Sequence, residues 1–462
     1  MLLISEHFQY YNRSDNHYDV IQKIDYHSFS SEGLESTVPI CFKSDEKKSC
    51  LQIFIEDDKA KIENSYYIGL DWIRQWGLPV QIESKMNSSA GQLDALGMLL
   101  EALKEPENFK HLDDLMEVKF DEEWIEVKGD SSIHLTPFLL IQFLMIVKSI
   151  VRKGLKKDYY RVTENLESRV KGKILVAQQI RQNTVRNHRT KTVCSYQEYG
   201  IDTEANRFLK YVLHFVQSQI LQFEDEDLKD KLLEPLSYNL GGFQQVSEER
   251  FYTFKNKEHN PMFKEYNTAI QLGIQILKLN DHNLSKAAEK RNTYPPHWID
   301  MSKLFELYVF KKLREKFTGK DEVQYHTKVY KQELDFIINT EQFKAVVDAK
   351  YKPRYKKGNP SMEDARQLSG YARLNRVYTK LGLDNNEVIP VYFVYPKELQ
   401  IEELVEDLNE EEEDVFETLE KKITDNKIGQ SLFSANDEVR KSTSYREMYM
   451  QEIEMRFTSG KL

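Results

Sequence analysis

The stretch KQELDFIINTEQFKAVVDAKYKPRYKK, residues 331–357, decides how the C-terminal part of the chain is expected to fold. Leu334, Phe336 and Ile338 recur at every second position, and a second short apolar run begins at residue 345. Polar residues 339–343 between the two runs are typical of a turn. The pattern therefore predicts a β-hairpin, with Asp335 on its first strand and Asp348 on its second.

The hairpin brings together residue types suited to a metal site. Asp348 and Lys350 are two residues apart, so a strand points both side chains to one face and the small Ala349 to the other. Two neighbouring carboxylates repel each other unless a cation lies between them, and they are oxygen ligands suited to Mg²⁺. We expect Asp335 and Asp348 to bind Mg²⁺, for which Mn²⁺ can substitute, with the carbonyl oxygen of Ala349 as a further ligand. Lys350 would orient the attacking water. The plainer alternative is a chance arrangement on solvated strands.

Neighbouring segments fit the same chemistry. Upstream, residues 304–309 have the pattern of an amphipathic helix, on which Glu306 is either an extra contact to metal or water or a plain surface glutamate. Downstream, residues 363–374 predict a helix on which Gln367 and Tyr371 share one face. A basic run interleaved with tyrosines follows the hairpin and suits a phosphate backbone. This run contains Lys352, Arg354, Lys356 and Lys357.

The segments LFE, LDF, VVDAKY and QLSGYA, taken together, resemble a PD-(D/E)xK nuclease core of the kind found in McrC and RecB nucleases. The resemblance places Asp335, Asp348 and Lys350 at the catalytic positions, and Gln367 and Tyr371 at a downstream QxxxY motif. The segments YYIGLDWI, GLPVQIESKM, KGKILVAQQIRQN and SYQEYGIDTEANRFLKYVL are similar to the N-terminal and middle parts of the McrC family. These proteins are the nuclease subunits of McrBC modification-dependent restriction systems.

The resemblance implies a Mg²⁺-dependent DNA endonuclease subunit that is activated by a McrB-like AAA+ GTPase hexamer and stimulates that GTPase. In McrC proteins the N-terminal domain inserts into the central pore of the hexamer, and Arg74 and Lys85 are candidates here for the stimulating residue. The implied substrate is double-stranded DNA that is modified or foreign. The 462 residues contain no GxxxxGK[ST] sequence, so nucleotide-driven work would require such a partner.

Length and composition favour an α+β protein of two to three domains with sizeable cores, since 40% of the 462 residues are hydrophobic. Residues 1–130 predict a strand-rich N-terminal domain, which would dock into the partner ring. Residues 131–296 predict a mainly helical middle domain. Residues 297–462 predict the α/β nuclease domain, with an acidic excursion at 402–420.

Cysteine usage and hydropathy indicate a cytoplasmic protein without a membrane span. The three cysteines form no CxxC pair, which argues against a disulfide scaffold and for a reducing compartment. The most apolar run, residues 137–151, is shorter than the roughly twenty residues that a membrane span requires. A buried helix is the better interpretation of this run.

Positive charge is concentrated in residues 151–191, although the formal net charge of the chain is −10. This block holds twelve basic residues and three acidic ones, and we interpret it as a mainly helical, DNA-facing surface. A face for an acidic partner and a merely solvated helical surface remain alternatives. The candidate phosphate contacts are Arg169, Lys171, Lys173, Arg181, Arg186 and Arg189.

A second motif, Asp202, Thr203, Asn206 and Arg207, predicts a helix cap and a buried polar network rather than chemistry. Two other functions stay open for the whole chain. One is a stand-alone RecB-like exonuclease for DNA repair. The other is a non-catalytic activator of an AAA+ ring, against which the two acids beside a lysine argue, because an unused site has no reason to keep repelling carboxylates.

Overall fold

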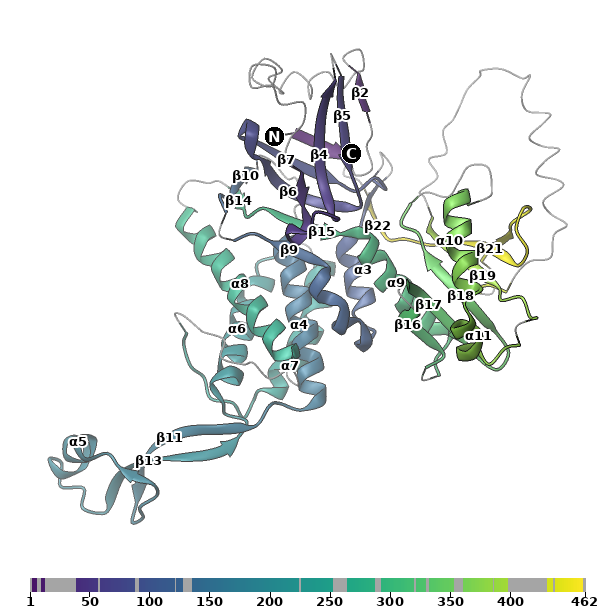
Figure 1. Cartoon of the computed structure of the whole chain (residues 1–462). Helices are drawn as coiled ribbons and strands as arrows, with labels where there is room; N and C mark the ends of the chain where they lie inside the picture. Colours follow the sequence, from purple (N-terminus) through teal and green to yellow (C-terminus); the bar gives the residue numbers. More distant parts are fainter. Residues whose placement is uncertain are drawn as a thin grey trace. The chain divides into compact units, whose positions relative to one another are not determined.

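The chain begins in one compact unit, leaves it for a second and then returns to the first. In the computed structural model the first unit comprises Met1–Ile133 and Arg291–Leu462, and the second comprises His134–Lys290. The N-terminal and C-terminal segments, which the sequence analysis treats as two domains, thus share a unit. Both units mix helices and sheets, which confirms the α+β class (Figure 1). The structure describes residues 2–5, 10–12, 39–56, 59–87, 91–120, 122–127, 135–223, 226–251, 264–286, 292–319, 321–329, 332–352, 360–384, 386–397, 430–434 and 437–459.

The described N-terminal part is rich in strands, as predicted, whereas the acidic excursion at 402–420 lies outside the described residues. Alternate residues of the strands face the core, as Leu51 and Ile53 do. One sheet has the order β1-β7-β6-β15-β9, with β1 (Leu2–Ser5), β6 (Tyr67–Ile73), β7 (Leu78–Glu83), β9 (Met116–Val118) and β15 (His297–Asp300). Another has the order β2-β5-β4-β3, with β2 (Tyr10–Asn12), β3 (Ile40–Cys41), β4 (Ser49–Glu56) and β5 (Lys59–Asn64).

Trp298 on β15 joins the returning chain to the N-terminal strands. Its side chain is fully buried in the cluster that contains Phe42. The indole Nε1 donates a hydrogen bond of 2.8 Å to Asp71 Oδ2, and the same oxygen accepts one of 2.8 Å from Lys119 Nζ. Removing residues 1–130 would therefore open a core that the C-terminal segment completes.

Two capped helices lie against each other beneath these strands. Helix α3 (Ala95–Ala102) packs on α9 (Met301–Lys316). The Asp94 side chain accepts a hydrogen bond of 2.7 Å from the Gly97 N–H, and the Asp300 side chain accepts one of 2.9 Å from the Lys303 N–H. Each carboxylate thus satisfies an N–H group that has no partner within its helix.

The C-terminal part of the first unit is built on a six-stranded sheet, and its central strands are parallel while its outer strands are antiparallel. The predicted hairpin is confirmed, since Phe336 lies opposite Val347 in an antiparallel pair. In the order β16-β17-β18-β19-β21-β20 the strands are β16 (Val323–Val329), β17 (Gln332–Asn339), β18 (Lys344–Ala349), β19 (Val391–Pro396), β21 (Met448–Ile453) and β20 (Val439–Lys441). The helices that follow β18 are α10 (Met362–Ala372) and α11 (Asn375–Leu381).

Short elements complete this unit. Two-stranded sheets pair β10 (Ile125–Val127) with β14 (Asn292–Tyr294), and β8 (Gly91–Leu93) with β22 (Phe457–Ser459). The described residues of this unit also form 3-10 helices at η1 (Phe42–Ser44), η2 (Arg74–Trp76) and η3 (Pro106–Asp114). Both two-stranded sheets join a segment from the beginning of the chain to one that follows residue 291, so they tie the two halves of the unit together.

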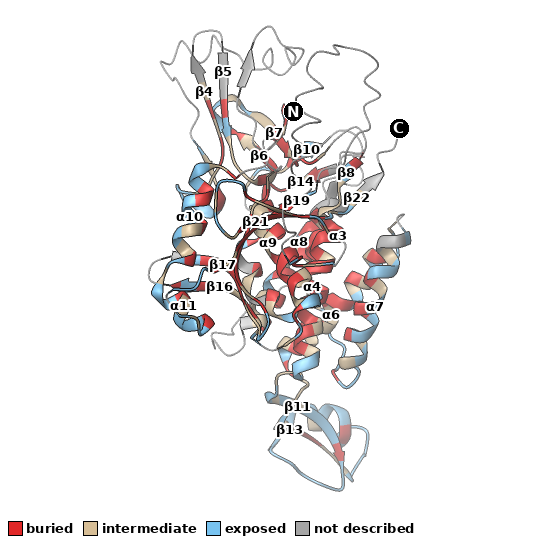
Figure 2. Cartoon of the chain, turned by 90° about the vertical axis from the view of Figure 1, so that its right-hand side faces the viewer, coloured by how far each residue is buried: buried red, intermediate tan, exposed pale blue. Residues whose placement is uncertain are grey.

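The second unit is mainly helical, as predicted. Its helices are α4 (Leu135–Lys153), α6 (Glu204–Ile220), α7 (Glu226–Gly242) and α8 (Lys264–Lys286). Among the described residues, α4 is the one helix long and apolar enough to cross a membrane by composition. Its neighbours α7 and α8 pack against it, and 72% of its most apolar stretch is buried. Figure 2 shows α4 largely in the colour of buried residues. Such burial is typical of a core helix, in line with the prediction for residues 137–151.

The basic block of residues 151–191 is not mainly helical, which corrects the prediction from the sequence. It forms much of a ribbon in which β11 (Asp158–Glu167) pairs along its whole length with β13 (Lys191–Gly200), and β12 (Lys173–Ile174) adds to β13. Only α5 (Val176–Gln179) and the π-helical turn η4 (Ile180–Thr184) are helical within the loop. The period-two pattern of residues 158–167, and not the helical spacing of the residues that follow, determines the secondary structure of this block.

The ribbon extends away from the helices of its own unit (Figure 1). Gly172 lies at its turn with φ 69°, where a Cβ atom would come within 2.5 Å of the Ser195 carbonyl oxygen. Only glycine fits this position without displacing the neighbouring strand. We call residues 158–200 the β11–β13 projection.

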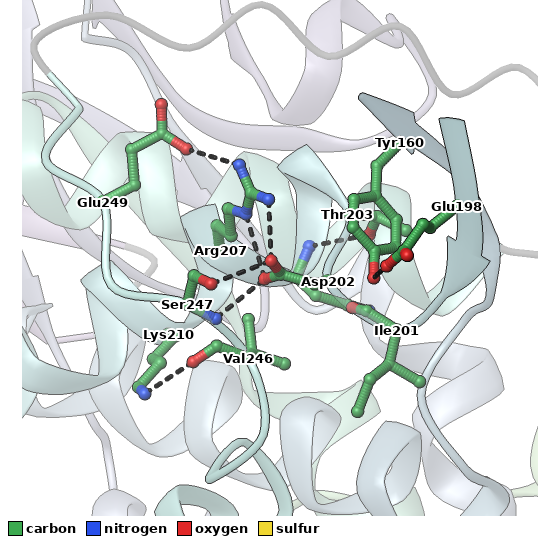
Figure 3. A network of polar contacts seen from close by, with 11 residues as sticks. Tyr160, Glu198, Ile201, Asp202, Thr203, Arg207, Lys210, Val246, Ser247 and Glu249 are labelled. Atoms are coloured by element: carbon green, nitrogen blue, oxygen red, sulfur yellow. Dashed lines mark hydrogen bonds and ion pairs between the residues drawn. The ribbon is translucent and has the colours of Figure 1, made fainter. Parts of the chain in front are cut away.

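The predicted polar network of the second unit is confirmed (Figure 3). The Thr203 hydroxyl caps α6 by accepting from the Asn206 N–H at 3.3 Å. The fully buried Asn206 amide donates to the carbonyl oxygens of Lys156 and Ile201, at 2.9 and 2.7 Å. Arg207 donates two hydrogen bonds to the carboxylate of Asp202, of 3.0 and 2.7 Å. These residues fix the base of the β11–β13 projection to the helices.

This network predicts an acid-sensitive contribution to stability. Burial raises the pKa of Asp202, but hydrogen bonds from Arg207 and Ser247 outweigh burial and lower it below the usual 3.8. A depressed pKa stabilises the fold above about pH 4, and this contribution is lost as the pH falls through the folded-state value. We expect Asp202→Asn to lower the free energy of unfolding by about 1.5–3 kcal/mol at pH 7. At pH 3 the difference from the unchanged chain should be much smaller.

Urea unfolding at the two pH values measures this difference. Glu249 is the matched control, because it pairs with Arg207 at 3.3 Å but its side chain is 46% exposed. Glu249→Gln should change stability by less than about 1 kcal/mol. This account would be contradicted if Asp202→Asn and the unchanged chain differed in their free energy of unfolding by the same amount at pH 7 and at pH 3.

Candidate active site

A cavity of about 160 Å³ in the first unit is lined by all six residues that the sequence analysis assigns to catalysis. They come from α9, β17, the end of β18 with the residue that follows it, and α10, which meet at one end of the hairpin. The six residues are Glu306, Asp335, Asp348, Lys350, Gln367 and Tyr371.

The two aspartates reach the cavity from adjacent strands. Asp335 precedes Phe336, and Asp348 follows Val347, the residue that pairs with Phe336. Asp335 Oδ2 accepts a hydrogen bond of 2.9 Å from the Ala349 N–H, so the backbone of β18 holds the carboxylate of β17 in place. Asp348 is buried, with 4% of its surface exposed. The register of the hairpin therefore brings the two carboxylates together.

Burial and mutual repulsion make the carboxylates hard to ionise. Burial raises the pKa of Asp335 well above its ordinary value, and the negative charges of Asp348 and Glu306 add to the rise. Burial also raises the pKa of Asp348, against which the ammonium group of Lys350 acts in the opposite direction. A cation placed between the two groups would relieve both effects, because it favours the charged forms.

Lys350 supplies one positive charge to this cluster. Its Nζ lies 2.8 Å from Asp348 Oδ2 and 3.9 Å from Asp364 Oδ1. Burial lowers the pKa of Lys350, but the carboxylates of Asp348, Asp335 and Asp364 outweigh burial and raise it. Lys350 is therefore held as an ammonium ion at neutral pH, a form that can donate hydrogen bonds but cannot accept a proton.

Helix α10 orients the same lysine from the other side. Lys350 Nζ donates to Gln367 Oε1 at 3.5 Å, and Gln367 Nε2 donates to the Tyr371 hydroxyl at 2.7 Å. Gln367 and Tyr371 are one helical turn apart, as the sequence predicts, and they act on the cavity as a pair. Their position supports a role in holding Lys350 and meeting a ligand at the cavity mouth.

Glu306 belongs to the cavity but is engaged by other side chains. Its Oε2 accepts hydrogen bonds from the Tyr325 hydroxyl at 3.0 Å and lies 2.9 Å from His326 Nε2. His326 Nδ1 lies 3.0 Å from Glu333 Oε1, so the imidazole bridges two glutamates. His326 has φ 49°, a backbone conformation that non-glycine residues rarely adopt. Glu306 is thus more firmly held than a plain surface glutamate.

The donor set of the cavity fits Mg²⁺ better than a transition metal. Among the described residues, no group of three or more His, Cys, Asp or Glu side chains is placed to hold a metal. Mg²⁺ uses one or two carboxylates and keeps several waters, so Asp335 and Asp348 suffice for it. Asp348 Oδ2 is buried and makes no well-directed hydrogen bond, although Lys350 Nζ is close to it. The ion pair with Lys350 leaves other lone pairs of the Asp348 carboxylate for a cation.

The residues predicted to contact DNA divide into three groups. Lys352 lines the cavity and donates to Asp364 Oδ2 at 2.6 Å. Arg354, Lys356 and Lys357 lie outside the described residues. The other six are exposed on the β11–β13 projection, in the second unit: Arg169, Lys171, Lys173, Arg181, Arg186 and Arg189.

Sequence reasoning did not identify two of the contributors to the site. Asp364 faces both Lys350 and Lys352, and its only sequence signal is the start of α10, where Ser361 accepts a hydrogen bond from the Asp364 N–H at 3.1 Å. Tyr66 lines the cavity from the N-terminal part of the chain, and no local pattern points to it. The residues proposed to stimulate a partner are also engaged: Arg74 pairs with Glu122 at 2.7 Å.

Comparisons with known proteins place the chain among restriction-system proteins. The model of a family described as McrBC 5-methylcytosine restriction system component matches residues 67–382, which is more than half of the chain. A comparison with curated protein sequences finds no match.

Four solved chains are similar to this one, among them two chains of McrBC assemblies. The chain is similar to one from the refined half-complex of the tetradecameric assembly of Thermococcus gammatolerans McrB AAA+ hexamers with bound McrC, with 15% identity and a TM-score of 0.38, over 98% of this chain and 94% of that one. It is also similar to a chain of the Thermococcus gammatolerans McrBC complex, with 14% identity and a TM-score of 0.27, over 70% and 89% of the two chains.

Proposed function

The chain belongs to the family of McrBC 5-methylcytosine restriction system components, and from this membership and the cavity we propose that it is the Mg²⁺-dependent DNA endonuclease subunit of such a system. The observation that carries the proposal is the meeting of Asp335, Asp348 and Lys350 in one cavity. The six-stranded sheet with α9 and α10 beside the site supports a PD-(D/E)xK core.

The roles of the residues follow from their contacts. Asp335 and Asp348 would hold Mg²⁺, with the carbonyl oxygen of Ala349 as a further ligand. When bound, Mg²⁺ would polarise the phosphodiester and lower the pKa of a coordinated water. Lys350 would orient the attacking water and offset the negative charge that develops on the phosphate. Gln367 keeps the Lys350 ammonium group in place.

Glu306 has a different role in this proposal. Its carboxylate already accepts a hydrogen bond from Tyr325 and lies beside His326, so it is better placed to act on a water in the cavity than to bind the metal directly. Its negative charge also raises the pKa of Asp335, so a bound cation would have a larger stabilising effect on the ionised carboxylate.

A McrB-like AAA+ GTPase hexamer is the proposed partner. The family is named as a component of a restriction system, and the 462 residues contain no P-loop sequence. The chain would therefore cut double-stranded DNA, modified or foreign, only when a nucleotide-driven partner presents it. An assay of the isolated chain with Mg²⁺ and linear DNA tests this dependence. Rapid degradation of free ends without any partner would favour the RecB-like exonuclease instead.

The β11–β13 projection is a second surface for DNA or the partner, besides the N-terminal segment 1–130. Seven of the twelve exposed large hydrophobic residues in the described part of the chain lie on it, among them Val176 and Val185. Exposed apolar side chains next to basic ones are typical of an interaction surface. The basic residues of this surface are predicted from the sequence, but its exposed apolar ones are not, because exposure cannot be seen in a pattern of residue types.

Charge reversal on the β11–β13 projection tests whether this surface binds DNA or the protein partner. We expect the triple variant Arg181→Glu, Arg186→Glu and Arg189→Glu to weaken DNA binding if these side chains contact phosphates. The slope of log K against log salt should then fall by about 0.9 for each lost contact. Charge reversal at Arg440, in the other unit, is the control. Arg440 pairs with Glu438 at 2.7 Å and lies outside both basic segments, residues 151–191 and 352–357. An unchanged slope together with lost stimulation of the GTPase would assign the projection to the protein partner.

A further inference from the structure

Residues from the N-terminal strands reach the strand end that carries Lys350. Tyr351, the next residue, is buried, and its hydroxyl lies 2.8 Å from the hydroxyl of Ser84, directly after β7. Lys85 Nζ donates a hydrogen bond of 2.7 Å to the Tyr351 carbonyl oxygen. The two residues that follow β7 thus bind both the side chain and the backbone of Tyr351.

Cation–π contacts of the Lys85 ammonium group with two tyrosine rings strengthen this contact. Lys85 Nζ lies 4.4 Å from the centre of the Tyr351 ring and 4.7 Å from the centre of the Tyr66 ring. An ammonium group within about 6 Å of a ring face is attracted by the electrons of the ring. Tyr66 and Tyr351 both line the cavity, and the Tyr66 carbonyl oxygen accepts from the Met301 N–H at the start of α9. Lys85 is therefore fixed between two walls of the site.

The backbone around Tyr351 determines where the site residues lie. The Lys350 N–H donates to the Val394 carbonyl oxygen at 2.8 Å, and the Ala349 N–H donates to Asp335. A shift of Tyr351 would move Lys350 through the peptide bond that joins the two residues, and Ala349 through Lys350. Errors of about 1 Å in the placement of a reacting group can lower a rate about 10²-fold.

We propose that Lys85 and Ser84 are positioning residues that hold Lys350 and Ala349 in the cavity through Tyr351. Lys85 is not a free residue available to stimulate a partner; it couples the N-terminal strands to the site of cleavage. This inference rests on the proposed function, since it assigns the residues that position the same site. It also implies that a partner bound to the N-terminal strands can change the position of Lys350.

Hydrogen exchange in the full chain tests the positioning without any cleavage. We expect Lys85→Met to raise the exchange rate of the amides of Ala349, Lys350 and Lys352 by about tenfold or more, since each 1.4 kcal/mol of local stability is a factor of ten. Lys85→Arg keeps the cation and should restore most of the protection. Lys43→Met is the matched control, because Lys43 pairs with Asp114 at 3.2 Å and lies 5.5 Å from the Phe42 ring, away from the cavity. Unchanged exchange at the three amides in Lys85→Met would overturn the inference.

Cleavage kinetics of the assembled system give the second measurement. With the fold confirmed by an unchanged unfolding midpoint, Lys85→Met should lower kcat about 10–100-fold while the KM for DNA changes less than about threefold. A loss of activity that only follows the unfolded fraction would count against positioning. The Asp348→Asn variant in the same assay separates the proposed endonuclease function from the positioning by Lys85. If Asp348→Asn still cuts while Lys85→Met loosens the amides, the proposed function fails and the positioning by Lys85 stands.

Discussion

Asp348→Asn is expected to lower the rate of DNA cleavage by about 10³-fold or more, the upper end for the loss of one electrostatic group from a site. The asparagine keeps the shape of the side chain but removes the negative charge and an oxygen ligand. Asp348 is buried, and its carboxylate is the closest acidic partner of the Lys350 ammonium group at 2.8 Å. The variant therefore loses a ligand for the cation and leaves Lys350 without its nearest counter-charge.

Two measurements on the full chain check this prediction. Calorimetric titration with Mn²⁺ reports binding to the cavity directly, and the assembled system reports cleavage. Asp348→Asn should weaken Mn²⁺ binding and abolish cutting while its unfolding midpoint changes little. Glu341→Gln is the control, because Glu341 is exposed in the turn of the same hairpin. Cleavage by Asp348→Asn at the rate of Glu341→Gln would refute the assignment of the active site.

Trp298→Ala is expected to lower the free energy of unfolding of the first unit by about 3–5 kcal/mol, the cost of emptying the site of a large buried aromatic side chain. The indole is fully buried in a cluster whose other buried members all come from residues 2–82. Its loss also removes a hydrogen bond to Asp71, a buried carboxylate that would keep only Lys119 on the same oxygen and the Trp72 N–H on the other. Such a loss is a large part of the stability of most proteins.

Tryptophan fluorescence reports on this unit alone, because all four tryptophans lie in it. Urea unfolding followed by fluorescence should show an earlier transition in Trp298→Ala, and far-UV circular dichroism should show that the helical second unit unfolds as before. Trp124→Ala is the comparison, since Trp124 is only half-buried, and its cost should be near 1 kcal/mol. Equal midpoints for the two variants would show that Trp298 does not hold the core together.

The hairpin and its three charged residues could be predicted because the information is local. Apolar residues at alternate positions determine strand pairing, and Lys350 follows Asp348 by two positions, directly after the end of β18. That Gln367 and Tyr371 share a face could be predicted for the same reason, since one helical turn separates the two residues. In each case a short repeat determines which side chains share a face, and the structure brings these faces to one cavity.

The remaining contacts of the site depend on pairs of residues that are far apart in the chain. Tyr351 and Lys85 are separated by more than 260 positions, and no periodicity within either segment indicates that they meet. The β11–β13 ribbon was missed for a different reason. Its charged residues fit a solvated helix as well as an exposed strand, and the pairing of β11 with β13 across a long loop decides between the two.

The division of the first unit into two segments has a consequence for how the protein is made. The sheet that begins with β6 and β7 receives its neighbour β15 only after residue 300 has left the ribosome. At about 5–20 residues per second, the strands ending at Ile73 would wait about 10–45 s for that partner. The helical unit in between can be complete by then. During synthesis the apolar faces of the first strands therefore stay uncovered for this time, and a cell that produces this chain must shield them or accept its aggregation.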